Sequence, residues 1–454
     1  MRTLFVSREA PYPVRSGAPL RMWQNIELLA TRGPVFAFSV GGVNDVVGVP
    51  PPLSGWLHVD RAEFEAKPAR GIGRVKKILR PRQYPIDNDA VTGEMNRRLR
   101  AYIRAVRPDV IVLSHWVDAC PDALKGFPSV IVDAHNVESV LARDLAHVHS
   151  PRRSLRRAFL DMRFRRRELK LFRQAKRVWV PSEHDARTVL ELDRSLAKPI
   201  VWPNAVDVDS YAAVRTRTTA DLDGLEPNGK TMIYVGFYWY PPNARAAQHL
   251  IEHTLPAVRR RHPDARLLLV GKDPTQLMLD AASRDEGILV TGCVADTRPY
   301  LALADVCPVP LTEGSGTRLK LLEAFSCGIP VVSTSKGAEG IEAGSGAEIL
   351  IADDPERFAA AVAEVFDEPD RFRDQARRAL ELVRNRYSWD ALADQLDDAL
   401  PSSVPKRYDA ATKRAGRASG PLRLRSRVVA KEGSDEVDRD REDRRRVMLG
   451  GDLR

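Results

Sequence analysis

Short apolar runs alternate along the chain with longer stretches in which apolar residues recur at the spacing of a helix. The short runs are rich in Val, Ile and Leu without strict alternation, which is typical of parallel strands buried on both faces. Strands that alternate with helices predict an α/β fold with crossover helices. The predicted strands cover residues 3–7, 35–40, 109–114, 129–133, 177–181 and 199–202 in the first half, and 231–236, 266–271, 288–291, 305–310, 329–333 and 349–352 in the second.

These strands form two sets of about six, which predicts two Rossmann-like domains with doubly wound parallel sheets. A chain of 454 residues is also too long for one ordinary core. Between 207 and 229 the sequence is polar and rich in breakers, so we place the domain boundary there. The predicted units are an N-terminal domain (1–206), a C-terminal domain (207–400) whose last helices can pack back on the first, and a charged tail (401–454) that we expect to be disordered.

The composition is that of an ordinary globular protein, with 43% hydrophobic and 29% charged residues. The four cysteines lie far apart, without a CxxC pair or a histidine at ligand spacing, which argues against a zinc site or a disulfide framework. No apolar run approaches the roughly 20 residues that span a bilayer. The first apolar run is too short for a signal peptide. We therefore expect a cytoplasmic protein.

The strongest local signal is the segment 311–334, LTEGSGTRLKLLEAFSCGIPVVST, which predicts a strand, a glycine loop, a helix, a glycine stop and a strand. Gly314 and Gly316 allow a ligand to approach the backbone, and Ser315 and Thr317 complete the loop. A helix that begins after the loop presents N–H groups and the positive end of its dipole. We expect a diphosphate to bind here, at the carboxyl end of a parallel strand.

Helical spacing places charged side chains on the ligand side of this helix. At about 100° per residue, Lys320, Glu323 and Cys327 share one face, and the leucines and the phenylalanine between them fall opposite. Lys320, with Arg318 nearby, is placed to neutralise a leaving diphosphate, and Glu323 to accept hydrogen bonds from ribose hydroxyls. The alternative is a solvated Lys–Glu pair on an ordinary helix, but the glycine loop favours a binding site.

Over about residues 1–400 the sequence resembles glycosyltransferase family 4, the group 1 transferases with a GT-B fold. The segment EAFSCGIPVVST is similar to that family's signature, EAMACGxPVVxS. Six further segments resemble family elements in the same order, which is more specific than any single match. They are PYPVRSGAPLRMWQNIELLATRG, VPSEHDARTVL, PIVWPNAVDVDSY with Ala205 in place of a glycine, MIYVGFYWYPPN, LLLVGKDP and VTGCVADTRPYLALADVCPVPL.

The resemblance implies roles for individual residues in binding a nucleotide-sugar donor. Glu323 matches a conserved glutamate that contacts the ribose, and Gly17 matches a glycine near the donor phosphate and the acceptor. Gly236 ends the strand that opens the second domain. Gly271 and Val294 belong to segments that line the base pocket. We expect all five residues to contribute to the donor site.

Two departures from the family pattern fall in the same site. The family has a glutamate for the donor sugar eight residues before its second glutamate, where this chain has Ser315, and Glu313 is two residues out of register. The family also has an arginine and a lysine where this chain has Phe237 and Pro242. We expect the cations at the start of the helix to take over the contact with the diphosphate.

In the first half, the segment VIVDAHNVES ends a predicted strand with polar residues, which should face the crevice. His135 matches, by position, a family histidine near the donor sugar. We therefore name His135, Arg318 and Lys320 as the catalytic candidates. The alternative for His135 is a loop histidine held by a neighbouring carboxylate. His115, which also ends a strand, is a weaker candidate.

The implied reaction is transfer of a sugar from a nucleoside-diphosphate sugar to a glycan or lipid-linked acceptor, in polysaccharide or cell-envelope glycan synthesis. The resemblance implies retention at the anomeric carbon without a metal ion or other cofactor, and domain closure to exclude water. One alternative is a non-catalytic protein that binds a nucleotide sugar or a partner. Another is a sugar-nucleotide 2-epimerase, which would need several carboxylates in the cleft.

Part of the net charge of +10 lies in the segment 152–177, where arginines surround an apolar seam. One interpretation is a helix near anionic lipid or a lipid-diphosphate acceptor, which would make the protein peripheral on the inner face of the membrane. The other is a surface helix packed on its own domain. No nucleic-acid-binding module is evident, so we expect no nucleic acid partner. The seam consists of Leu155, Phe159, Met162, Leu169 and Phe172.

Overall fold

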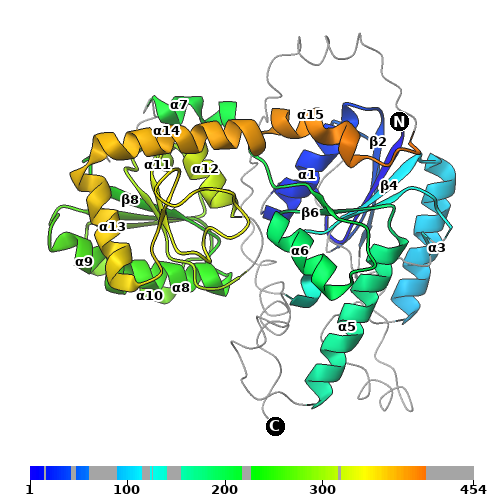
Figure 1. Cartoon of the computed structure of the whole chain (residues 1–454), viewed down its shortest axis with the longest axis horizontal. Coiled ribbons are helices and arrows are strands. Elements are labelled where there is room, and N and C mark those ends of the chain that lie inside the picture. Colours follow the sequence, from blue (N-terminus) through cyan, green and yellow to red (C-terminus); the bar gives the residue numbers. More distant parts are fainter. Residues whose placement is uncertain are drawn as a thin grey trace.

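The structure is a computed structural model of the chain (Figure 1). The residues that it describes are 1–14, 17–41, 48–60, 89–114, 123–124, 126–140, 155–216, 226–314 and 318–404.

The N-terminal half is built on one parallel sheet of seven strands, in the order β3-β2-β1-β4-β5-β6-β7. The sequence predicted six of these strands and missed β3. This strand lies at the sheet edge, is half-buried along most of its length and contains Gly55, so it lacks the continuous apolar run of its neighbours. The strands are β1 (Thr3–Ser7), β2 (Val35–Gly41), β3 (Leu53–Asp60), β4 (Val110–Ser114), β5 (Val130–Asp133), β6 (Arg177–Val180) and β7 (Ile200–Val201).

Helices cover both faces of this sheet, as a doubly wound fold requires. On one face, α1 (Gly17–Ala30) packs Met22 and Ile26 against alternate residues of the strands. On the other face, α3 (Asp89–Val106), α5 (Leu155–Gln174) and α6 (Glu183–Leu192) share a second apolar cluster.

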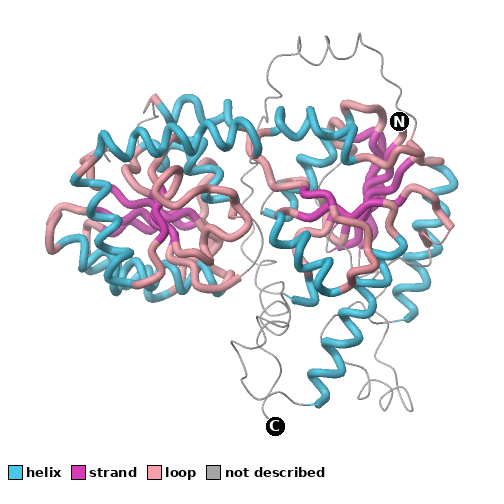
Figure 2. The backbone as a smooth tube through the Cα atoms, in the orientation of Figure 1, coloured by secondary structure: helices cyan, strands magenta, loops and turns pink. Residues whose placement is uncertain are grey.

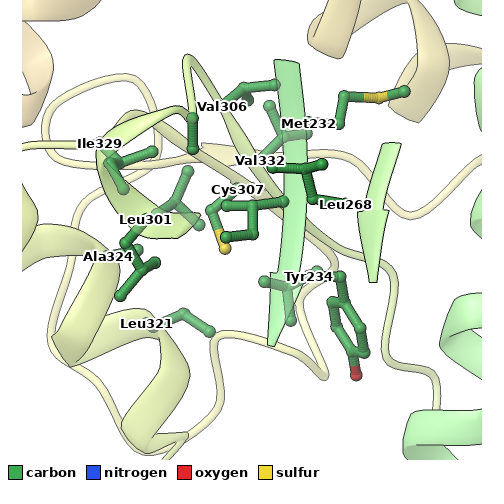
Figure 3. Close-up of a cluster of buried hydrophobic side chains, with 14 of the residues drawn as sticks. Met232, Tyr234, Leu268, Leu301, Val306, Cys307, Leu321, Ala324, Ile329 and Val332 are labelled. Atoms are coloured by element: carbon green, nitrogen blue, oxygen red, sulfur yellow. The ribbon is translucent and has the colours of Figure 1, made fainter. Parts of the chain in front are cut away.

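The C-terminal half has two three-stranded parallel sheets, β10-β9-β8 and β11-β12-β13. A bridge between Met232 and Val306 places them side by side. Their inner residues, with one face of α12, form a single core (Figure 3). The strands are β8 (Thr231–Val235), β9 (Arg266–Val270), β10 (Ile288–Gly292), β11 (Cys307–Val309), β12 (Val331–Ser333) and β13 (Leu350–Ile351).

The helices of the C-terminal half surround these strands (Figures 1 and 2). Helix α8 continues through a π-helical turn (Leu250–Thr254) into α9. The helices are η2 (Val208–Tyr211), α7 (Ala212–Arg215), α8 (Pro241–His249), α9 (Leu255–Arg259), α10 (Gln276–Arg284), α11 (Arg298–Ala302), α12 (Leu319–Cys327), α13 (Pro355–Asp367) and α14 (Pro369–Arg386).

The last helix crosses back to the N-terminal half. Figure 1 shows α14 along the C-terminal half, and α15 (Trp389–Ala399) continuing over α1. Leu392 and Leu396 are fully buried in the same cluster as Met22 of α1. Val404 is buried there too, and the remainder of the predicted tail, 405–454, lies outside the described residues.

Within the described parts of the chain, no helix combines the length and the apolar character needed to cross a lipid bilayer.

Candidate active site

The carboxyl ends of β8 and β9 meet backbone to backbone at two of the predicted donor-binding glycines. The Gly236 N–H donates to the Val270 carbonyl at 2.9 Å. Gly271 has a φ of +139°, and a Cβ at this position would lie 1.9 Å from the Gly236 oxygen. Only glycine fits there, so the strand ends present bare backbone to the space above them.

The loop between β11 and α12 is shaped by a third predicted glycine. Gly314 has a φ of +90°, and a Cβ here would lie 2.9 Å from the Tyr240 hydroxyl. Ser315, Gly316 and Thr317 lie outside the described residues.

Arg318 stands immediately before α12, which begins at Leu319, two residues later than the sequence predicted. Its side chain is 8% exposed, and Nη2 donates to the Glu313 carbonyl at 3.3 Å. Burial lowers the pKa of the guanidinium, and the neighbouring tyrosines and Glu339 oppose this effect. A fixed cation therefore lies at the amino end of α12.

Lys320 sits one residue inside the helix and is held by neutral partners. Its Nζ donates to the Asn243 side-chain oxygen at 2.9 Å and lies 3.7 Å from the centre of the Tyr234 ring. Burial lowers the pKa of the ammonium to about 7. An anion bound next to Nζ would favour the charged form of Lys320.

Glu323 follows Lys320 on the same face of the helix, as predicted. The Tyr211 hydroxyl donates to Oε1 of Glu323 at 3.0 Å, and burial raises the pKa of this carboxyl group. Cys327 lies beside Glu323 on this face, and the last turn of α12 packs into the core and leaves Cys327 4% exposed.

The residues that hold this site were not found from the sequence. Tyr211 lies in the segment after β7, and Asn243 lies in the first turn of α8. A third, Arg298, joins the loop after β10 to the Tyr211 segment, since its Nη1 donates to the Ser210 carbonyl at 3.3 Å. Val294 lies in that loop, half-buried against the core. Each of these three supporting residues nevertheless lies in a segment that resembles a family element: Tyr211 ends PIVWPNAVDVDSY, Asn243 ends MIYVGFYWYPPN, and Arg298 lies in VTGCVADTRPYLALADVCPVPL.

The two departures from the family pattern have structural consequences. Phe237, in the place of the family's arginine, faces the ammonium of Lys272 at 5.9 Å, and its ring lies 5.8 Å from that of Trp239. Pro242, in the place of the family's lysine, is buried in the first turn of α8. Glu313 forms a salt bridge with Arg245.

On the N-terminal side, His135 follows β5 and is 9% exposed. Its Nε2 lies 2.9 Å from the Ser114 hydroxyl and 3.4 Å from the Asp133 carboxylate. Burial opposes ionisation of Asp133, but the guanidinium of Arg21 and the contact with His135 together outweigh it and hold the pKa of this carboxyl far below its usual range. His115 lies outside the described residues.

The two halves approach each other near the predicted donor loop. A Cβ at Gly17, the first residue of α1, would lie 3.3 Å from Cδ1 of Leu319, the first residue of α12. His184 of α6 lies 3.4 Å from Glu339 of the C-terminal half. The amino ends of α1 and α12 therefore share one side of the molecule.

The basic segment forms α5, and its seam is buried only toward the carboxyl end. Leu169 and Phe172 pack in the core, whereas Met162 is 40% exposed. Leu155 and Phe159 lie in the part of α5 whose side chains are not described. Figure 1 shows α5 extending beyond the other helices of this half. Among the side chains of α5 that the structure describes, the exposed basic residues are Arg165, Arg166, Arg167, Lys170 and Arg173.

Comparison with known proteins gives two family matches. The family model described as "Glycosyltransferase Family 4" matches residues 58–210, and the model "Glycosyl transferases group 1" matches residues 229–368.

Curated relatives match part of the chain. A phosphatidyl-myo-inositol mannosyltransferase of Mycobacterium tuberculosis (strain ATCC 25618 / H37Rv) is 33% identical over 202 residues, which is 43% of this chain and 51% of the relative. A GDP-mannose-dependent alpha-(1-6)-phosphatidylinositol monomannoside mannosyltransferase of the same strain is 31% identical over 170 residues, which is 34% of this chain and 44% of the relative. The matches thus span about half the length of these relatives.

Solved structures match most of the chain. Sucrose-phosphate synthase from Thermosynechococcus elongatus superposes with a TM-score of 0.64 at 19% identity, over 88% of this chain and 98% of its own. An alpha,alpha-trehalose-phosphate synthase (UDP-forming) from Burkholderia vietnamiensis gives 0.61 at 14% identity, over 88% and 99%. These likenesses and the parallel sheets confirm the predicted GT-B fold.

Proposed function

Because the chain belongs to the group 1 glycosyltransferases of family 4, we propose that it transfers a sugar from a nucleoside-diphosphate sugar to a glycan or lipid-linked acceptor. The observation that carries this proposal is the grouping of Arg318, Lys320 and Glu323 at the start of α12, next to the bare strand ends at Gly236 and Gly271. The group provides two cations and a carboxylate where a Rossmann-like sheet binds its ligand.

The diphosphate binds, in this proposal, at the amino end of α12. Arg318 and Lys320 supply the positive charge that the family takes from the two positions after β8, now Phe237 and Pro242. The helix dipole adds to the attraction. As the bond to the sugar breaks, negative charge grows on the diphosphate, and fixed cations stabilise that charge most.

Glu323 binds the ribose hydroxyls in this proposal. Tyr211 donates to Oε1 of Glu323 and so fixes the plane of the carboxylate. We assign Oε2 to a ribose hydroxyl, which is a hydrogen-bond donor. The loop that holds Val294 lies on the same side of the sheet, after β10, and is assigned to the base.

The transfer itself proceeds with retention at the anomeric carbon and without a metal ion. The acceptor hydroxyl attacks from the face that the diphosphate leaves, and His135 contacts the donor sugar from the N-terminal half. The approach of α1 to α12 at Gly17 and Leu319 supports a site that both halves complete.

The acceptor and location follow from the relatives and from α5. The name of one relative gives GDP-mannose as its donor, and both names contain a phosphatidylinositol compound, so GDP-mannose is the first donor to test. The exposed arginines of α5 provide a surface that an anionic membrane would attract. We propose that the protein works at the cytoplasmic face of a membrane, in cell-envelope or polysaccharide synthesis.

A donor screen tests the nucleotide site. Purified protein is heated with UDP-, GDP-, ADP- and TDP-sugars, and the shift in unfolding temperature is measured. We expect one nucleotide to stabilise the protein, and Glu323→Ala to abolish the shift without loss of folding. Glu356→Ala, at an exposed position of α13, is the matched control and should keep it. A folded protein that responds to none of the donors would contradict the proposal.

Two observations on the donor-sugar side of the site favour a second function. Ser315 replaces the family's first glutamate, and Glu313 is bound to Arg245. A chain that binds the nucleotide sugar without turning it over would fit these two facts. Stabilisation by a donor without release of its nucleoside diphosphate, with any acceptor fraction, would favour this reading.

A further inference from the structure

A buried hydrogen-bond network connects β4, β5 and α1 directly behind His135. Its centre is Asp133, which is fully buried. Oδ1 of Asp133 accepts from Nε and Nη2 of Arg21, at 3.0 and 2.7 Å. Oδ2 accepts from the Asn25 amide at 2.9 Å and from the Ser114 hydroxyl at 2.8 Å.

The carboxylate of Asp133 can only accept hydrogen bonds. Burial opposes its ionisation, but the contacts with the Arg21 guanidinium and with His135 together keep the pKa of this group far below its usual range, so it is ionised at neutral pH. The single proton of the Ser114 hydroxyl must therefore point at Asp133.

The direction of the next hydrogen bond is then determined. The Ser114 oxygen lies 2.9 Å from Nε2 of His135. Because the serine proton is committed to Asp133, the serine oxygen can only accept from the ring, and Nε2 must carry the hydrogen. The 3.4 Å separation of Nε2 from the Asp133 carboxylate also favours an N–H at this position.

We infer that Ser114 and Asp133 are positioning residues that hold His135 in its Nε2–H tautomer. In the neutral ring the lone pair then lies on Nδ1. The assignment of the tautomer stands on the contacts alone. Its use in sugar transfer rests on the proposed function.

The same network extends to the segment that leads into the C-terminal half. Nη2 of Arg21 also donates to the Trp202 carbonyl at 2.8 Å, and Nη1 donates to the Asn204 side chain at 2.9 Å. The Trp202 indole donates to Asn25 at 2.8 Å. The groups that orient His135 are thus tied to the connection between the halves.

Nitrogen NMR of the intact protein tests the tautomer. Histidine-labelled protein gives signals from nine rings, and the His135 signals are those lost in His135→Gln. Spectra are recorded up to about pH 9, where an ordinary histidine is neutral. We expect Nε2 of His135 to carry the proton and Nδ1 to carry none. A proton on Nδ1, or a ring that keeps both protons throughout, would overturn the inference.

Ser114→Ala tests the positioning role. We expect the variant ring to populate both tautomers. Ser39 offers a matched control, since its hydroxyl lies 2.9 Å from Nδ1 of His58 on the same sheet. Ser39→Ala should change the His58 signals and leave those of His135 as in the parent protein. His135 signals that do not change in Ser114→Ala would contradict the role of the serine.

Kinetics then separate this inference from the proposed function. If the protein transfers sugar, Ser114→Ala should lower kcat by up to about 100-fold and alter its pH profile, with the KM for the donor nearly unchanged. If the protein has no transferase activity, the proposed function is wrong, but the NMR result still decides the tautomer of His135. Normal kcat with an altered tautomer would show that His135 positioning does not matter for transfer.

Discussion

The ammonium of Lys320 is the charge in the site most sensitive to its surroundings. Its pKa is lowered from 10.5 to about 7, so the free protein loses this charge as the pH rises through 7. A bound diphosphate restores the proton, which means that binding takes up a proton above pH 7. We predict that the Kd for the nucleoside diphosphate rises with pH from about 7 to 9, by at most about tenfold per pH unit.

Calorimetry with the nucleoside diphosphate at several pH values measures this effect. Lys320→Met should bind weakly at every pH and lack the dependence. Lys198→Met removes an exposed lysine and should behave as the parent protein. Affinity that stays constant across this pH range in the parent protein would show that Lys320 does not contact the phosphates.

A substitution at Gly271 tests the close approach of β8 and β9. We predict that Gly271→Ala lowers the free energy of unfolding by more than about 2 kcal/mol, because the new methyl group would collide with the Gly236 carbonyl in addition to straining the backbone. Gly292→Ala is the control: its φ is +66°, and its Cβ meets nothing within 4 Å. Only the backbone cost of about 1–2 kcal/mol should remain there. Equal losses in chemical denaturation would refute the collision.

At the residue scale, the sequence predicted which face of α12 carries charge but not what the charges contact. The spacing of Lys320 and Glu323 follows from the helix alone. Asn243 and Tyr211 come from elements remote in the chain, and only the tertiary fold brings them to the site. The same spacing placed Cys327 on this face but did not show that the core covers it, because that depends on how other elements pack against α12.

At the scale of elements, continuous apolar runs located the buried strands well, and the half-exposed edge strand β3 escaped this criterion. The sequence predicted that the last helices can pack back on the N-terminal half, but not which helix they would meet there. The structure places the apolar face of α15 on α1.

The packing of α15 predicts a large effect of one leucine. Leu396→Ala should lower the free energy of unfolding by about 2–5 kcal/mol, since Leu396 is fully buried against the N-terminal half. Asp394→Ala, on the exposed side of the same helix, should change it by less than about 0.5 kcal/mol. Denaturant titration of the two variants gives the comparison. Similar values would mean that α15 does not pack as described.

Glu168 anchors α5 to the segment that follows His135. Its carboxylate accepts the backbone N–H groups of Glu138 and Ser139, at 2.8 and 3.1 Å. Burial raises the pKa of Glu168 from 4.5 to about 7, so the folded state binds this proton more tightly than the unfolded state. The free energy of unfolding therefore falls as the pH rises from about 4.5 to 7, by up to about 3 kcal/mol.

Glu168→Gln removes this titration. We predict that the free energy of unfolding of the variant rises relative to that of the parent protein as the pH increases from 5 to about 8. Thermal unfolding of both proteins at several pH values measures this difference. Glu191→Gln, on an exposed position of α6, should show no such trend. A difference between variant and parent that does not change with pH would contradict a raised pKa.

At the scale of the whole molecule, the two sets of strands and the ordered family motifs were enough to predict two Rossmann-like sheets and their GT-B arrangement. The contacts between the halves were not predictable, because Gly17 with Leu319 and His184 with Glu339 depend on how two separately folded parts meet. The domain bounds 1–206 and 207–400, the disorder of the tail and the membrane role of the 152–177 segment stay predictions.

The central claim is that the cations at the start of α12 drive sugar transfer from a nucleoside diphosphate. The most direct measurement is turnover of the stabilising donor with an acceptor fraction in the presence of a chelator, with the anomeric configuration of the product read by NMR. We predict release of nucleoside diphosphate, retained configuration, and loss of turnover in Arg318→Ala and Lys320→Ala variants that still fold. Full turnover in both variants, or an inverted product, would contradict the account.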